Sequence, residues 1–360
     1  MMFNFRYLLA ALLCLMLSGC VTTPGVLKYD LEGEAEAGIV WPSAPEVARY
    51  QYIGQLTGEE NFVAEDDDAS MGRKIFEWVV GIMAGDETPV VLQRPQSGAV
   101  DSEGRVYVTD VSRGAVYVFD RQGGKLDVWE MAGEALRFQT PIGVVVVEKP
   151  DATREILVVD ADLKRVVTLD QQGVPLRHFG SDTLTRPTGL ARDPQSGQLY
   201  VADTHGHDIK IFSADGVLLN TLGVSARGEG PGQFNSPTHL TFAAGLLYVT
   251  DTLNSRVKVF TVEGELVRVF GRRGLFVGDM PRPKGLAVDS DGNIYVVESY
   301  YDHLLVFNGE GNLLLPIGGS GKGIGEFYLP AGVWTDHHDR IYVADSFNGR
   351  VVILQYLGGA

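Results

Sequence analysis

Residues 236–260 read SPTHLTFAAGLLYVTDTLNSRVKVF, and this stretch decides the fold. It holds a first apolar run after Pro237, a Gly turn, a second run that ends at Asp251, and a third run after Arg256. Short runs in which apolar and polar residues alternate are typical of β-strands, and Gly between them is typical of tight turns. The stretch therefore predicts three consecutive antiparallel strands.

The same pattern occurs in five other places, beginning at Arg94, Thr140, Arg186, Arg282 and Leu329. An acidic residue ends the second strand of every unit, at Asp110, Asp160, Asp203, Asp251, Glu298 and Asp345, with spacings of 50, 43, 48, 47 and 47 residues. In the second to fifth units a fourth run follows, before a Gly-rich loop. Four strands per unit in a repeat of this length are typical of propeller blades. We predict an all-β fold, a six-bladed β-propeller, in residues 94–360.

The repeat resembles the NHL repeat, whose marks are G-x-G-x-F-x-x-P, YV-[AT]-D and N-x-R-[VI]. The stretches that match these marks are residues 230–237, residues 248–256 and residues 342–350. The resemblance covers residues 94–357 and implies a propeller of NHL type. It implies little about function, because one fold of this kind serves many functions.

The sixth unit ends near Tyr356 with only three strands, so its outer strand must come from elsewhere in the chain. Residues 50–56, YQYIGQL, have the length and the alternation of a strand. We predict that residues 49–56 close the ring by pairing with the third strand of the last blade.

The N-terminus carries an export signal. A short apolar run follows Arg6, and the sequence Leu17-Ser18-Gly19-Cys20 resembles the lipobox of bacterial lipoproteins. This resemblance implies a signal peptide in residues 1–19, lipidation of Cys20, and, because Val21 follows the Cys, anchoring in the outer membrane. Residues 20–48 are then expected to form a tether between lipid and ring. The alternative is an ordinary signal peptide with a chance Cys.

Residues 57–93 form an acidic insertion between the closing strand and the first blade. Residues 70–84 have apolar residues at helical spacing, which predicts an amphipathic helix. This helix either packs on the propeller, or docks a partner or touches the bilayer. The net charge of the chain is −16. Nucleic acid is therefore not expected as a partner.

The six acids at the strand ends suggest structural roles. Each stands just before a tight turn, where a carboxylate can accept hydrogen bonds from backbone N–H groups. Arg165, Arg256 and Arg350 follow five residues later and are expected to pair with them. We predict no cofactor and no metal site among these acids.

An enzyme with a metal at the central axis is the alternative function. NHL-type propellers include the peptidyl-hydroxyglycine amidating lyase, in which several blades present a His near the start of the inner strand. This chain has that His once, at His239, and Gly at the matching positions 143, 189, 285 and 332. His205 and His207 could converge with it, whereas a lactonase-like site would need axial carboxylates that the inner strands almost lack.

One end of the ring is the better candidate for function. The loops that enter the first strands and the turns between second and third strands share this end. Its basic and aromatic residues are Arg186, His205, Arg227, His239, Arg272, Arg273, Arg282, Lys284, Tyr300, Tyr301 and Lys322. Such a mixture on an acidic protein favours a surface that binds a protein or peptide in the cell envelope. The ring itself is expected to be a monomer.

Overall fold

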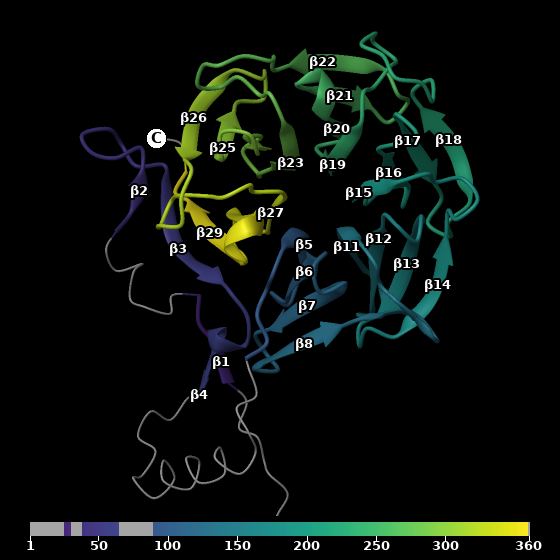
Figure 1. Ribbon diagram of the computed structural model, residues 1–360, viewed down its shortest axis with the longest axis horizontal. Coiled ribbons are helices and arrows are strands. Elements are labelled where there is room, and N and C mark those ends of the chain that lie inside the picture. The colour runs from purple at the N-terminus through teal and green to yellow at the C-terminus, as the bar shows by residue number, and fades with distance from the viewer. Residues whose placement is uncertain (1–24, 30–37, 65–88, 359–360) are drawn as a thin grey trace, which may run out of the picture.

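Six antiparallel sheets follow one another around a central axis in the computed structural model, which describes residues 25–29, 38–64 and 89–358 (Figure 1). The first strand of each sheet lies nearest the axis and the fourth lies at the rim. The prediction of an all-β six-bladed propeller is confirmed.

The blades share one order of strands, from the axis outward. The first three blades are β5 (Pro95–Val100), β6 (Val106–Asp110), β7 (Ala115–Asp120) and β8 (Lys125–Trp129); β11 (Pro141–Glu148), β12 (Arg154–Asp160), β13 (Arg165–Asp170) and β14 (Pro175–Phe179); and β15 (Pro187–Arg192), β16 (Leu199–Asp203), β17 (Asp208–Phe212) and β18 (Leu218–Leu222). The fourth and fifth are β19 (Pro237–Ala243), β20 (Leu246–Asp251), β21 (Arg256–Thr261) and β22 (Leu266–Phe270); and β23 (Pro283–Val288), β24 (Ile294–Glu298), β25 (His303–Phe307) and β26 (Leu313–Gly318). A short hairpin, β9 (Met131–Gly133) and β10 (Leu136–Arg137), follows the first blade.

The last blade takes its outer strand from the N-terminal part of the chain. Its own strands are β27 (Val333–Thr335), β28 (Arg340–Asp345) and β29 (Arg350–Tyr356), and β29 pairs antiparallel with β3 (Tyr50–Leu56). Tyr50, Tyr52 and Leu56 on β3 are buried. The expected ring closure is therefore observed, with the same residues.

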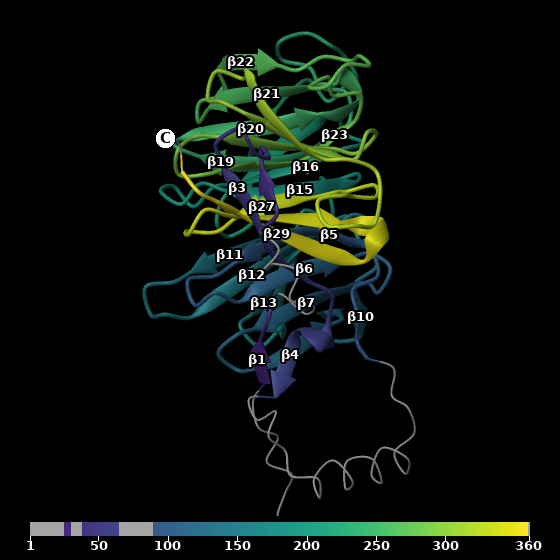
Figure 2. The ribbon, with the colours of Figure 1, turned by 90° about the vertical axis from the view of Figure 1, so that its left-hand side faces the viewer.

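Much of the expected tether packs on the ring instead of hanging free. β1 (Gly25–Leu27) pairs with β4 (Phe62–Ala64), and β2 (Val40–Trp41) pairs with β3. Figure 2 shows β1 and β4 at the rim of the ring. Leu27 is buried and Trp41 packs on the core, so these residues add apolar contacts. Their strands have only two or three residues, which is too short for a periodic pattern in the sequence.

Residues 57–64 and 89–93 are the described parts of the acidic insertion. The buried side chain of Asn61 accepts hydrogen bonds from the N–H groups of Thr57 and Gly58 and donates to the carbonyl groups of Lys28 and Gln55. The predicted helix over residues 70–84 lies outside the described residues. Within the described ranges the helices are three-residue 3₁₀ turns, and none is long and apolar enough to cross a bilayer.

Apolar side chains fill all six joints between neighbouring blades. Each of six buried clusters takes residues from two adjacent sheets, and the joints on both sides of the last blade include residues of β3. Because each blade is held by two neighbours, the stability of one joint depends on the strands on both of its sides.

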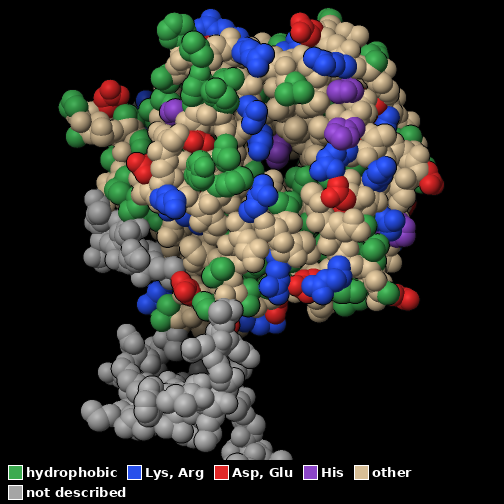
Figure 3. Space-filling view, viewed as in Figure 1, with side chains coloured by type: hydrophobic (Ala, Val, Ile, Leu, Met, Phe, Trp, Pro, Cys, Tyr) green, Lys and Arg blue, Asp and Glu red, His purple; other side chains and the backbone are tan. Residues whose placement is uncertain are grey.

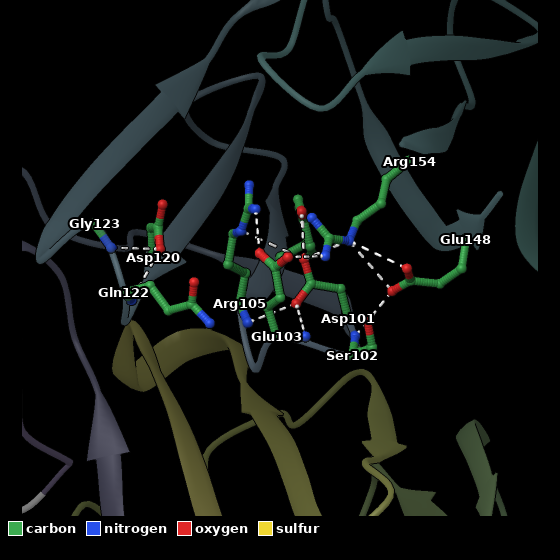
Figure 4. A network of polar contacts seen from close by, with 10 residues as sticks. Asp101, Ser102, Glu103, Arg105, Asp120, Gln122, Gly123, Glu148 and Arg154 are labelled. Atoms are coloured by element: carbon green, nitrogen blue, oxygen red, sulfur yellow. Dashed lines mark hydrogen bonds and ion pairs between the residues drawn. The ribbon is translucent and has the colours of Figure 1, made fainter. Parts of the chain in front are cut away.

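A buried ionic network joins the first two blades at the end of the ring opposite the candidate face (Figure 4). The Nε atom of Arg154 lies 3.4 Å from Oδ2 of Asp101 and 3.3 Å from Oε2 of Glu148, and its side chain is 4% exposed. Arg154 and Arg105 also bind Glu103 and lower the pKa of that carboxyl to about 2. This network supports the joint and lies away from the candidate binding residues.

Candidate binding face

The candidate face consists of entry loops and middle turns. An entry loop is the chain between the outer strand of one blade and the inner strand of the next, and a middle turn joins the second and third strands of a blade. We call this end of the ring the entry face. The entry loops used below are residues 223–236, 271–282 and 319–332, and the middle turns are residues 204–207, 252–255 and 299–302.

One acid per blade holds this face in place. Each of the six strand-end carboxylates accepts at least one backbone N–H from the entry loop that precedes its blade. Glu298, for example, accepts from the N–H of Arg282 at 2.8 Å and from the N–H of Tyr301 at 2.7 Å. The structural role predicted for the acids is confirmed, and the entry face is a preorganised surface.

The expected Arg partners are observed in two of three cases. The Nε atoms of Arg256 and Arg350 lie 2.8 Å from Asp251 and Asp345. The prediction for Arg165 is wrong, because its Nε donates to the carbonyl oxygen of Leu163 at 3.3 Å. Asp160, the strand-end acid of that blade, already accepts hydrogen bonds from four backbone N–H groups.

The entry loop of residues 271–282 presents an apolar tip to solvent. Leu275, Phe276 and Val277 are 84%, 77% and 67% exposed. The buried carboxylate of Asp279 braces the tip, since it accepts from the N–H of Phe276 at 2.8 Å and from Nε of Arg272 at 2.8 Å. Three adjacent exposed apolar side chains on a braced loop are typical of a contact surface.

Sequence reasoning missed this tip because it looked for charged and aromatic residues. A signal was present: three apolar residues lie between Gly274 and Gly278, in a loop where no strand alternation requires them. The two other entry loops have different chemistry. Residues 223–236 are mostly polar or Gly, and Ile324 in residues 319–332 packs partly buried on the core.

Most of the predicted face residues gather on the fifth blade beside the apolar tip. Tyr300 is 59% exposed and lies edge to face with Tyr301, at a centroid distance of 4.9 Å. Tyr301 and the apolar tip line one shallow pocket of about 110 Å³. Arg273 is exposed on the same loop. In Figure 3, hydrophobic side chains cluster on this side of the entry face, with Lys and Arg side chains between them and the central hollow.

The remaining predicted residues are spread over the neighbouring blades. His205 is exposed on the middle turn of the third blade, and Arg227 and Lys322 are exposed on entry loops. Arg186 is paired with Asp162, so its charge is already compensated. These residues surround the hollow rather than meeting at one point.

The central axis holds a cavity of about 360 Å³ lined by the six inner strands. Most blades have a Gly near the start of the inner strand, and this Gly lets neighbouring inner strands approach closely. A Cβ on Gly189, for example, would lie 2.7 Å from the carbonyl oxygen of Thr238. In the fourth blade His239 takes this position and its ring lines the cavity. Burial and the nearby Lys284 lower the pKa of His239 to about 3, so the ring is neutral at pH 7.

The axial cavity does not supply the ligands that the enzyme alternative needs. Its described lining has His239 but no Asp or Glu, and the described part of the chain has no cluster of three or more His, Cys, Asp or Glu suited to a metal. His207 does not join His239, because its Nδ1 accepts the N–H of Ser236 at 3.0 Å. A catalytic zinc site typically uses three protein ligands.

Comparison with known proteins supports the repeat and the fold. A family described as "6-bladed beta-propeller" matches residues 284–357, and the NHL repeat matches residues 184–212. The chain is an NHL-repeat six-bladed β-propeller. No curated protein matches it in sequence.

Among solved structures, similar folds have diverse functions. Virginiamycin B lyase from Staphylococcus aureus has a TM-score of 0.51 at 14% identity, over 74% of this chain and 96% of that one. An auxiliary nutrient binding protein from Bacteroides thetaiotaomicron has a TM-score of 0.56 at 12% identity, over 76% and 71%. A chain of a nidogen/laminin complex has a TM-score of 0.53 at 18% identity, over 71% and 89%. At these identities the likeness shows the fold alone.

Proposed function

We propose that this chain is an exported, lipid-anchored binding protein whose entry face holds a protein or peptide partner in the cell envelope. The observation that carries the proposal is the apolar tip of Leu275, Phe276 and Val277, which is exposed to solvent on a braced loop. Leaving these side chains in water costs free energy that burial against a partner would recover, at about 25 cal/mol per Å² of apolar surface.

The surroundings of the tip indicate the chemistry of the partner. Arg273 and Tyr300 flank it, and Tyr and Arg are the residue types that most often dominate binding energy at interfaces. The face is locally basic although the chain carries a net charge of −16. We therefore expect the partner to present an apolar patch with acidic residues around it.

The lipid anchor belongs to the same proposal. Lipidation of Cys20 after removal of residues 1–19 would hold the ring at the membrane, with the outer membrane as the expected location. Several acyl chains on one residue give more stable anchoring than a single chain. The proposed role of the protein is then to present its entry face to a partner at the membrane, and not to catalyse a reaction.

A site-specific crosslinking experiment tests the proposal. A photoreactive amino acid placed at Phe276 should give one defined adduct in intact cells. The matched control places it at Leu219, which is 53% exposed on the outer strand β18, away from the entry face. Loss of the Phe276 adduct on replacing Arg273 with Glu would support a basic face that binds an acidic partner. The same adducts from both positions, or none from Phe276, would contradict the proposal.

A further inference from the structure

Four basic side chains near the axial end of the entry face form no ion pair with a carboxylate of the described residues. Lys284 is half-buried at the start of β23, and Arg282, Arg94 and His239 are its charged or titratable neighbours. Burial, followed by the repulsion of Arg282 and Arg94, lowers the pKa of Lys284. In the described structure no hydrogen bond or ion pair involves the ammonium group of Lys284 or the guanidinium of Arg282.

His239 adds a second, independent observation. Its Nε2 atom is buried and has no hydrogen-bond partner within the described residues, while its Nδ1 atom lies 3.1 Å from Oγ1 of Thr238. A buried polar atom without a partner is costly, as is a half-buried ammonium without a counter-ion. The fully buried Lys258, by contrast, donates to three backbone carbonyl oxygens.

We propose that Lys284, Arg282 and Arg94 form an anion subsite at the axial mouth of the entry face, which takes a carboxylate of the bound partner, with His239 as a neutral hydrogen-bonding neighbour. The subsite deepens the proposed function, on which it rests for the source of the carboxylate. Guanidinium and ammonium groups bind carboxylates through charge-assisted hydrogen bonds. Figure 3 shows Lys, Arg and His side chains bordering the central hollow on this face.

A monoanion fits these groups better than a phosphate dianion. Arg94 is partly engaged, with its guanidinium 4.7 Å from the centroid of the Phe347 ring, and His239 contributes no charge at neutral pH. The cavity beyond His239 is lined mainly by Gly, Val, Leu and Ala. The subsite therefore offers two or three cations at the edge of an apolar space.

The first test uses small anions, so that it does not depend on the partner. Acetate and inorganic phosphate are titrated at constant ionic strength against the mature chain, with the imidazole NMR signals of His239 and the melting temperature as readouts. Acetate should shift the His239 signals and raise the melting temperature. Lys284→Met should weaken acetate binding at least tenfold, because one charge-assisted hydrogen bond is lost. Lys125→Met, which removes an exposed Lys of the outer strand β8, should bind acetate as the wild type does.

The melting temperature without anion separates a binding role from a structural one. Removing an unpaired, half-buried charge should leave the melting temperature of Lys284→Met equal to or above that of the wild type. A lower melting temperature would show that Lys284 stabilises the fold and would overturn the proposal. Acetate effects that are equal in wild type and Lys284→Met, or binding of phosphate alone, would also overturn it.

The source of the carboxylate is decided with peptides. An acidic peptide with an amidated C-terminus and an apolar peptide with a free C-terminus compete with acetate in the same titration. Competition by either assigns the source, and competition by neither overturns the claim that a partner supplies the carboxylate. Acetate binding without a Phe276 crosslink would support the subsite and contradict the proposed partner surface. A Phe276 crosslink without acetate binding would support the partner surface and contradict the subsite.

Discussion

Replacing Leu56 with Ala tests whether β3 holds the ring closed. Leu56 is fully buried, pairs with Val351 of β29, and packs in the joint between the last blade and the first. A buried Leu→Ala substitution costs about 2–5 kcal/mol, which includes the cavity it leaves. The hydrogen-bonded strands around Leu56 cannot easily collapse into that cavity, so we expect the upper half of this range. A typical domain has a stability of about 5–15 kcal/mol, and the loss should therefore be plain.

The measurement is urea unfolding of the mature chain without its lipid, followed by Trp fluorescence. The matched control is Val47→Ala, which lies in the same N-terminal segment and is 68% exposed. Its free energy of unfolding should change by less than about 0.5 kcal/mol. If the two variants unfold at the same urea concentration, β3 does not stabilise the ring and the reasoning on closure is refuted.

Truncation gives a coarser form of the same test. Deleting residues 21–57 removes β3 and exposes the edge of β29, so the protein should melt well below the intact chain and aggregate. Deleting residues 21–44 keeps β3 but removes Leu27 and Trp41, which pack on the core. We expect an intermediate melting temperature, whereas the deletion of a free tether would have no effect. Equal melting temperatures for both truncations would contradict a separate role for β3.

Three further predictions follow from other parts of the molecule. Arg154→Met removes one of the two Arg partners of the buried Asp101 and should cost about 1.5–3 kcal/mol in urea unfolding, because Arg105 still lies 3.5 Å from that carboxylate. Lys125→Met breaks an exposed pair and should cost less than about 1 kcal/mol. The pKa of His239 is about 3 in the folded chain, below its ordinary value of 6.5, so the unfolded chain takes up the proton first on acidification. Stability should therefore fall between pH 6.5 and 3, by roughly 1.4 kcal/mol per pH unit from this group, and His239→Asn should unfold with a shallower dependence on pH. Cys20→Ala should release the protein from the membrane fraction or leave it unprocessed, and unchanged membrane extraction with unchanged mass would reject lipidation.

The propeller could be predicted from the sequence because each blade repeats a local pattern. Strands joined by short turns need no knowledge of distant contacts, and the missing outer strand of the last unit pointed to residues 50–56. β1 and β2 could not be predicted in this way, because strands of two or three residues show no period. Their pairing depends on residues far away in the chain, such as Leu27 with Phe62.

The candidate site could be predicted only in part, for a related reason. Loop residues have no period, so the sequence indicated which residues share the entry face but not their exposure or their spacing. Tyr300 and Tyr301 were predicted as aromatic residues of the face, whereas the apolar tip of Leu275–Val277 was missed, because three apolar residues in a loop do not show by themselves whether they are exposed. Arg94 was missed because its relation to Lys284 arises only when the ring closes and places the first and fifth blades on either side of the last blade.

The departures from the repeat are the strongest guide to function in this molecule. A residue that the fold requires should recur in every blade. The acid at the end of the second strand recurs in this way, and the axial Gly recurs in most blades. His239 replaces the axial Gly in the fourth blade. The fifth blade has Lys284 just before its axial Gly, an apolar tip in its entry loop and Tyr300 in its middle turn. None of these residues is needed to build a blade, since the other blades form without them. Because they lie on one sector of one face, the single ligand that we propose, in contact with both the tip and the axial mouth, would account for all of them.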